Sequence, residues 1–151
     1  MKIKILLDDD YTVVSKELAF FLGMQENLEV VRKELTGKKA LVIVEEVQPD
    51  IILMDLYIPN KDGIETIASI KSKYPDVKVF VLTNFSNPEH VLLALKAGAS
   101  GYILKTVKPS QFVAAIRSAY QGNIQISSDV FKMLLSQTLP QEEAQIHQIP
   151  M

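Results

Sequence analysis

Short apolar runs alternate with stretches of helical periodicity along most of the chain. The runs are rich in β-branched residues and predict five strands, at 3–7, 28–31, 51–54, 77–82 and 102–104. Between and after them, apolar residues recur three and four positions apart, which predicts five amphipathic helices. Their apolar faces begin at Val14, Ala40, Ile64, Val91 and Phe112. This alternation favours a parallel sheet with helices on both faces, because parallel neighbours need crossover connections.

The periodic pattern ends near Gly122, so we expect one domain over residues 1–122. Ser127-Ser128-Asp129 resembles a helix N-cap and precedes further apolar residues, which predicts a short amphipathic helix within 123–135. Residues 136–151 are rich in Gln and Glu and contain two prolines, as is typical of a linker or tail. The length of 151 residues leaves no room for two full domains.

Composition excludes several classes of function. Sixteen basic residues against eighteen acidic ones give a net charge of −2, which is not the footprint of a protein that binds nucleic acid or an anionic membrane directly. The absence of cysteine excludes disulfides, thiolate metal sites and cysteine nucleophiles, and two histidines cannot build a zinc site. The sequence shows neither a secretory signal nor an apolar run long enough to cross a membrane, so we expect a cytoplasmic protein.

Polar side chains follow four of the predicted strands. Three consecutive acids, Asp8 to Asp10, follow the first strand, Asp55 ends the third, Thr83 follows the fourth and Lys105 the fifth. In doubly wound sheets ligands bind at the carboxyl ends of the strands, so these side chains are expected to converge. Converging carboxylates repel one another unless a cation neutralises them, and Mg²⁺ prefers such oxygen ligands. Thr83 and Lys105 could then contact a phosphoryl group held on one of the acids.

The order and spacing of these residues resemble a bacterial two-component response regulator receiver domain. The resemblance rests on Asp9-Asp10, on Leu53-Met54-Asp55-Leu56 followed by Pro59 and Asp62-Gly63, on Thr83 and on Lys105. It covers residues 2–122, and the stretch Ala97-Gly98-Ala99-Ser100-Gly101-Tyr102 is most like the subgroup with a LuxR-type helix-turn-helix output domain. The resemblance implies an α/β flavodoxin-like fold, a doubly wound five-stranded parallel sheet in the order 2-1-3-4-5 with five helices.

The resemblance also implies roles for the polar residues. Asp55 would accept a phosphoryl group from a sensor histidine kinase, and Lys105 and Thr83 would contact the oxygens of that group. The implied Mg²⁺ ligands are Asp9, Asp10, Asp55 and the backbone carbonyl of Tyr57, and no other cofactor is implied. Such a protein is a phosphoacceptor switch that catalyses only its own phosphorylation and dephosphorylation, and not an enzyme acting on a further substrate.

In this family the threonine hydroxyl shifts together with an aromatic residue of the fifth strand, here Tyr102, which couples the site to the surface of the fourth helix, fifth strand and fifth helix. On helical wheels, four apolar residues of that surface lie away from the core-facing stripes: Leu92, Leu93, Val113 and Tyr120. We therefore expect a phosphorylation-dependent symmetric homodimer that acts on transcription. DNA would be contacted only through an output domain, which this chain lacks, and no membrane contact is expected.

Alternatives stay open at this point. The chain could be a stand-alone phosphoacceptor protein, or a receiver-like module that never takes phosphate, instead of a fragment of a longer transcription regulator. Asp8-x-Asp10-x-Thr12 also resembles the nucleophile motif of haloacid dehalogenase-like phosphatases, with Asp8 as the nucleophile. Those enzymes need a further acidic pair after the lysine, and nothing beyond Lys105 has that form.

Asp8 stands where the family usually has an apolar strand residue. Three consecutive acids therefore leave open which pair holds the metal. Strand alternation points Asp8 away from Asp9 and toward a helix layer, where a charge is costly without a partner. On this reasoning, Asp8→Val is expected to raise thermal stability and to weaken metal binding only slightly.

Overall fold

The computed structural model describes residues 2–8, 13–33, 35, 39–55, 61–83, 88–104, 108–122, 125–126, 132 and 135. The strands are β1 (Ile3–Asp8), β2 (Leu28–Lys33), β3 (Ile51–Asp55), β4 (Lys78–Thr83), β5 (Gly101–Leu104) and β6 (Gln125–Ile126). The helices are α1 (Val13–Gly23), α2 (Lys39–Val47), α3 (Lys61–Lys73), α4 (Pro88–Lys96) and α5 (Pro109–Tyr120). The five predicted strands and the five helices predicted between and after them are present, with bounds shifted by a few residues.

All strands run parallel in the order β2-β1-β3-β4-β5-β6, which confirms the predicted order 2-1-3-4-5. The two-residue β6 extends the sheet beyond β5 and was not predicted. It lies inside 123–135, so the helix predicted there cannot begin before Ser127. Of the later residues in that range, Lys132 and Leu135 are described and have helical backbone.

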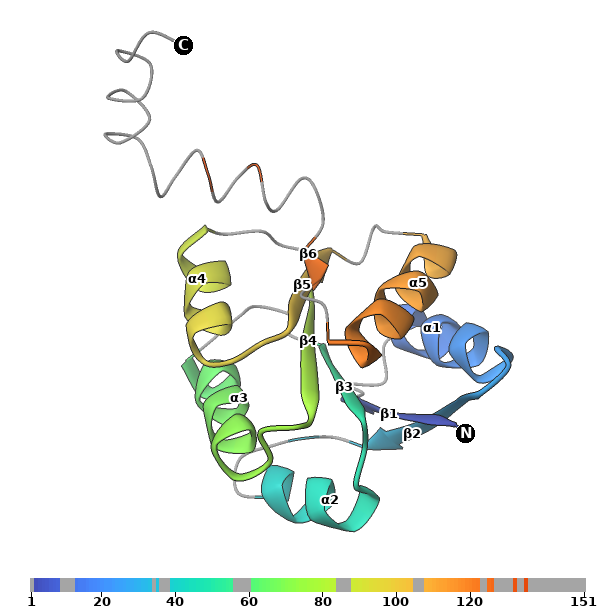
Figure 1. The fold of residues 1–151 in the computed structure, drawn as a ribbon, viewed down its shortest axis with the longest axis horizontal. Helices are drawn as coiled ribbons and strands as arrows, with labels where there is room; N and C mark the ends of the chain where they lie inside the picture. The colour runs from blue at the N-terminus through green and yellow to red at the C-terminus, as the bar shows by residue number, and fades with distance from the viewer. Residues whose placement is uncertain are drawn as a thin grey trace, which may run out of the picture.

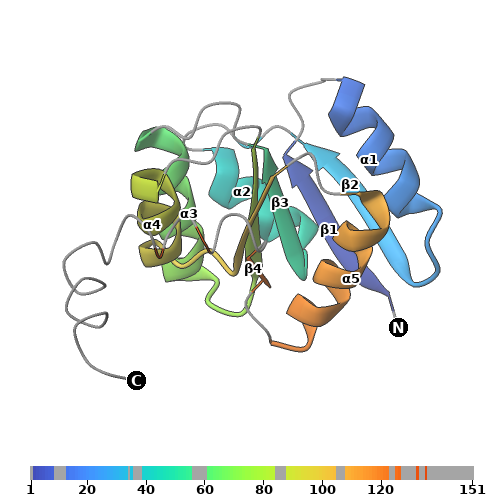
Figure 2. The ribbon, with the colours of Figure 1, turned by 90° about the horizontal axis from the view of Figure 1, so that it is seen from above.

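Helices cover both faces of the sheet. Figures 1 and 2 show α1 and α5 on one face, and α2, α3 and α4 on the other. Two core clusters correspond to these layers, and the central strands contribute to both by alternation. In β3, for example, Ile51 and Leu53 pack toward α1 and α5, whereas Ile52 and Met54 pack toward α2, α3 and α4. Burial on both faces explains why this strand reads as a continuous apolar run.

The turn between α4 and β5 is built against a lysine of α3. Gly98 has a φ of +112°, a conformation that residues with a side chain rarely adopt. A Cβ at this position would lie 2.8 Å from Cγ of Lys71. The Lys71 ammonium donates hydrogen bonds to the carbonyl oxygens of Pro75 and Val77, each at 2.7 Å. Burial, and then the charge of Lys78, lower the pKa of Lys71.

Candidate phosphoacceptor site

The strand register brings the predicted site residues to one edge of the sheet. The paired residues nearest that edge are Asp8 with Met54, Asp55 with Leu82, and Thr83 with Leu104. Asp55 is the last residue of β3 and Thr83 the last residue of the neighbouring β4. Adjacent strands lie about 4.8 Å apart, so these two backbone positions belong to one small region at the carboxyl ends of the strands.

Four predicted site residues, Asp9, Asp10, Tyr57 and Lys105, lie outside the described residues. Chain connectivity still restricts two of them, because consecutive Cα atoms are about 3.8 Å apart. Asp9 directly follows Asp8 at the end of β1, and Lys105 directly follows the last residue of β5. Their predicted contacts with metal or phosphoryl oxygens stay predictions.

Asp8 has a hydrogen-bond partner that the sequence did not reveal. Its side chain is half-buried, and its Oδ1 accepts a hydrogen bond from the backbone N–H of Leu35 at 2.9 Å. Leu35 is only 7% exposed and belongs to the core cluster under α2, α3 and α4, on the same face as Leu6 of β1. The carboxylate is therefore held on that face. The premise that the Asp8 charge lacks a partner is therefore wrong. Asp8→Val would leave the Leu35 amide without its acceptor, so a loss of stability is now expected in place of a gain.

Tyr102 is fully buried in β5. Its side chain has 0% exposure and belongs to the same core cluster as Val91 and Ala94 of α4. Its register partner on β4 is Val81, two residues before Thr83. A buried aromatic ring thus lies in the core cluster that contains the α4 residues, on the strand next to the one that ends in Thr83. The coupling of Tyr102 to the Thr83 hydroxyl stays a prediction.

The four predicted output residues differ in their exposure. Leu93 is 45% exposed and Tyr120 is 36% exposed, as the helical wheels predicted. Leu92 and Val113 are half-buried instead, and they pack against the two different core clusters. Figure 1 shows the reason: α4 and α5 cover opposite faces of the sheet, with β5 and β6 between them. Within the predicted set, only Leu93 and Tyr120 offer substantial apolar surface.

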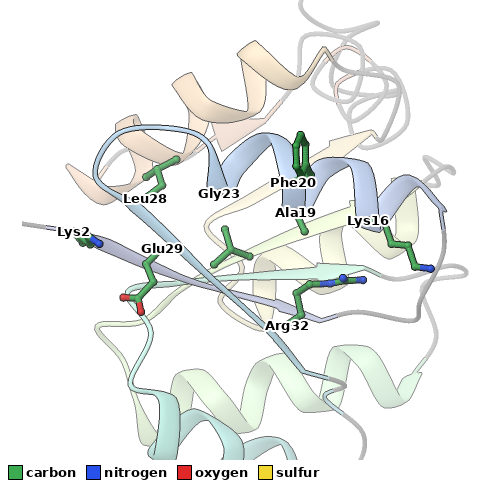
Figure 3. Close-up of a pocket in the computed structure, with 9 residues that line it drawn as sticks. Lys2, Lys16, Ala19, Phe20, Gly23, Leu28, Glu29 and Arg32 are labelled. Atoms are coloured by element: carbon green, nitrogen blue, oxygen red, sulfur yellow. The ribbon is translucent and has the colours of Figure 1, made fainter.

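A groove of about 560 Å³ lies along α1 and β2 (Figure 3). It is lined by Lys2, Lys16, Ala19, Phe20, Gly23, Leu28, Glu29, Val30 and Arg32. Phe20 is 72% exposed at its rim. None of the predicted phosphoacceptor residues lines this groove, so it is a separate feature of the surface at the β2 edge of the sheet.

Two features are absent from the part of the chain that the structure describes. No described helix is long and apolar enough to cross a membrane. No three described acidic or histidine residues are grouped as metal ligands. The second result does not include Asp9 and Asp10, which are not described.

Comparison with known proteins places this geometry in a family. Residues 5–117 match the model of the response regulator receiver domain. The uncharacterised transcriptional regulatory protein YhcZ of Bacillus subtilis is 41% identical over 133 residues, which cover 88% of this chain and 62% of YhcZ. The response regulator protein VraR of Staphylococcus epidermidis is 40% identical over 122 residues, which cover 81% of this chain and 58% of VraR.

A solved structure gives the same result. The two-component response regulator of the LuxR family from an Aurantimonas species superimposes with a TM-score of 0.82 at 27% identity, over 92% of this chain and 99% of that one. The present chain spans only about 60% of the length of the two curated relatives. From the length of the family match, the identity to these regulators and the shared fold, we conclude that the chain belongs to the response regulator receiver domain family.

Proposed function

We propose that this receiver domain accepts a phosphoryl group on Asp55 in the presence of Mg²⁺. The observation that carries the proposal is the strand register, which brings Asp55 and Thr83 to the same edge of the sheet, beside the strand that leads into Asp9 and Asp10. This arrangement combines a nucleophilic carboxylate, further acids and a hydroxyl within one small region. Phosphoryl transfer needs this combination, because catalysis depends on positioning and on charge neutralisation.

In the proposed reaction, a carboxylate oxygen of Asp55 attacks the phosphorus of the donor. With acetyl phosphate as donor, a new P–O bond to Asp55 forms, the P–O bond to the acetyl group breaks, and acetate leaves with the electron pair. The Thr83 hydroxyl donates a hydrogen bond to one phosphoryl oxygen, and the Lys105 ammonium pairs with another. With a sensor histidine kinase as donor, the bond that breaks is the P–N bond of its phosphohistidine.

The donor set at this edge fits Mg²⁺. Asp8 is bonded to the Leu35 amide on the α2 face, which leaves Asp9 and Asp10 as the acidic pair for a metal. Together with Asp55 and the backbone carbonyl of Tyr57, they would supply the carboxylate and carbonyl oxygens that a hard cation prefers. When bound, Mg²⁺ would reduce the repulsion between the acids and the incoming phosphoryl group.

The same observation weighs against the phosphatase alternative. That reading requires Asp8 as the nucleophile, but the Asp8 carboxylate is directed to Leu35, whose side chain is buried in the core. The family match gives independent support for Asp55, because it covers the chain from β1 to α5. We therefore propose a phosphoacceptor switch whose own catalysis is limited to its phosphorylation and dephosphorylation.

We further propose that the output is transcriptional. YhcZ is named as a transcriptional regulatory protein, and both curated relatives continue well beyond the matched region. The partners would be a sensor histidine kinase, a second copy of the chain in a phosphorylation-dependent homodimer, and DNA through a region outside this chain. Leu93 and Tyr120 are the exposed members of the proposed output surface.

The test uses the purified chain with acetyl phosphate and Mg²⁺. Intact-protein mass spectrometry should show one phosphoryl adduct, which should be absent in Asp55→Asn and in the parent protein after chelation of Mg²⁺. Asp50→Asn is a matched control, because Asp50 directly precedes β3 and its carboxylate lies at the other end of that strand from Asp55. An adduct that persists in Asp55→Asn would refute the assignment.

A further inference from the structure

The carboxyl end of β1 is tied to the core by a side chain. Asp8 is the last residue of β1, and its Oδ1 accepts a hydrogen bond from the N–H of Leu35 at 2.9 Å. Leu35 comes two residues after the end of β2, and its buried side chain is anchored in the core cluster. The bond therefore joins the end of β1 to an anchored position on the connection that follows the neighbouring strand.

This hydrogen bond lies at the residue that directly precedes the proposed metal ligands Asp9 and Asp10. Asp9 is the next residue, so its Cα can lie only about 3.8 Å from that of Asp8. Alternation along a strand directs consecutive side chains to opposite faces. Holding the Asp8 carboxylate on the α2 face therefore fixes the orientation of the last strand residue before the acidic pair.

We propose that Asp8 is a positioning residue for the Mg²⁺ site: by bonding the Leu35 amide, it fixes the end of β1 and thus the acidic pair Asp9 and Asp10. The inference rests on the proposed function, since it assumes a metal held by that pair. It reverses the expectation drawn from the sequence, that loss of Asp8 leaves metal binding nearly unchanged. Partners that orient metal ligands from outside the coordination shell commonly matter for affinity.

The chain offers a matched control at the other end of the same strand. The N–H of Lys4, the second residue of β1, donates to Oδ2 of Asp50 at 2.8 Å. Asp50→Ala and Asp8→Ala therefore each remove one carboxylate that accepts a backbone N–H. Only Asp8 adjoins the proposed metal ligands. Asp8→Asn completes the set, because its amide oxygen can still accept from Leu35 while the negative charge is gone.

The experiment measures the Mg²⁺ dissociation constant of the parent chain and of the three variants without any phosphodonor. For each protein, the rise of the unfolding midpoint with Mg²⁺ concentration gives the constant relative to that protein's own metal-free midpoint. Asp8→Ala should bind Mg²⁺ about 10-fold more weakly, the lower end of the effect of outer-shell partners. Asp8→Asn and Asp50→Ala should both stay within about 3-fold of the parent, below that range.

Each other outcome overturns the inference in a distinct way. Equal Mg²⁺ dissociation constants for Asp8→Ala and the parent would show that Asp8 has only a structural role. An equally large loss in Asp8→Asn would show that the charge of Asp8, or direct ligation by it, is what matters. An equally large loss in Asp50→Ala would trace the effect to general destabilisation. A parent chain that binds no Mg²⁺ at all would overturn the proposed function itself, and this inference with it.

Discussion

Replacing Gly98 by alanine tests how the chain is turned from α4 into β5, the strand that carries Tyr102 and precedes Lys105. The substitution has two costs. The first is backbone strain, because φ is +112° and a side chain disfavours positive φ. The second is a clash, because the new Cβ would lie 2.8 Å from Cγ and 3.1 Å from Cβ of Lys71.

The structure sets the size of the effect. Backbone strain of this kind costs about 1 to 2 kcal/mol. The Lys71 stem cannot swing aside freely, because its ammonium is bonded to the carbonyls of Pro75 and Val77. Disrupting that arrangement adds about 1 to 2 kcal/mol. Gly98→Ala should therefore lower the free energy of unfolding by about 2 to 4 kcal/mol.

Urea unfolding of four proteins separates the two costs: the parent, Gly98→Ala, Lys71→Ala and the double variant. In the Lys71→Ala background the clash with Cγ is absent, so Gly98→Ala should cost at least about 1 kcal/mol less than in the parent. Effects that add within about 0.5 kcal/mol would show that the Lys71 stem is not the obstacle. An unchanged stability of Gly98→Ala would refute the backbone argument as well.

Three further predictions concern neighbouring features. Burial, and then the Lys78 charge, lower the pKa of Lys71 below 10.5. As the pH rises, the folded state therefore loses this proton at a lower pH than the unfolded state does. The stability of the parent relative to Lys71→Met should therefore rise with pH between the lowered pKa and about 10.5, and a falling or flat difference would contradict the sign. Tyr102→Ala should cost about 3 to 5 kcal/mol in urea unfolding, because the ring is fully buried, and a cost below about 1 kcal/mol would contradict that burial. Leu93→Glu should leave stability within about 0.5 kcal/mol but weaken the proposed phosphorylation-dependent dimer in sedimentation, and an unchanged dimerisation constant would exclude this face of α4.

The fold was predictable because local pattern and layer packing agree. β3 and its neighbours are buried on both faces, which requires the continuous apolar runs visible in the sequence. The two-residue β6 leaves no comparable signal, since it is too short for any periodicity. Its pairing with β5 depends on the position of the chain after α5, a tertiary property.

The site was predictable as a set of residues at strand ends, because topology alone brings Asp55 and Thr83 to one edge. The partner of Asp8 was not predictable. Leu35 lies 27 positions away, and the contact depends on the pairing of β1 with β2. The sequence indicated only that Leu35 is an apolar residue within a polar stretch after β2, which is typical of a buried position but does not identify its partner.

Helical wheels predicted the exposure of Leu93 but not the partial burial of Leu92 and Val113. A helical wheel assumes that a helix is buried along one face only. Because α4 contacts α3 as well as β5, residues on its flank are also partly buried. The wheels also could not show that α4 and α5 cover opposite faces of the sheet.

Locating the modified residue shows whether Asp55 is the phosphoacceptor. The parent chain is treated with acetyl phosphate and Mg²⁺, the acyl phosphate is reduced with borohydride, and the peptides are sequenced by mass spectrometry. Reduction converts a phosphorylated aspartate to homoserine. Homoserine is expected at position 55 and nowhere else, whereas homoserine at position 8, 9 or 10 would contradict the assignment of Asp55 as the phosphoacceptor.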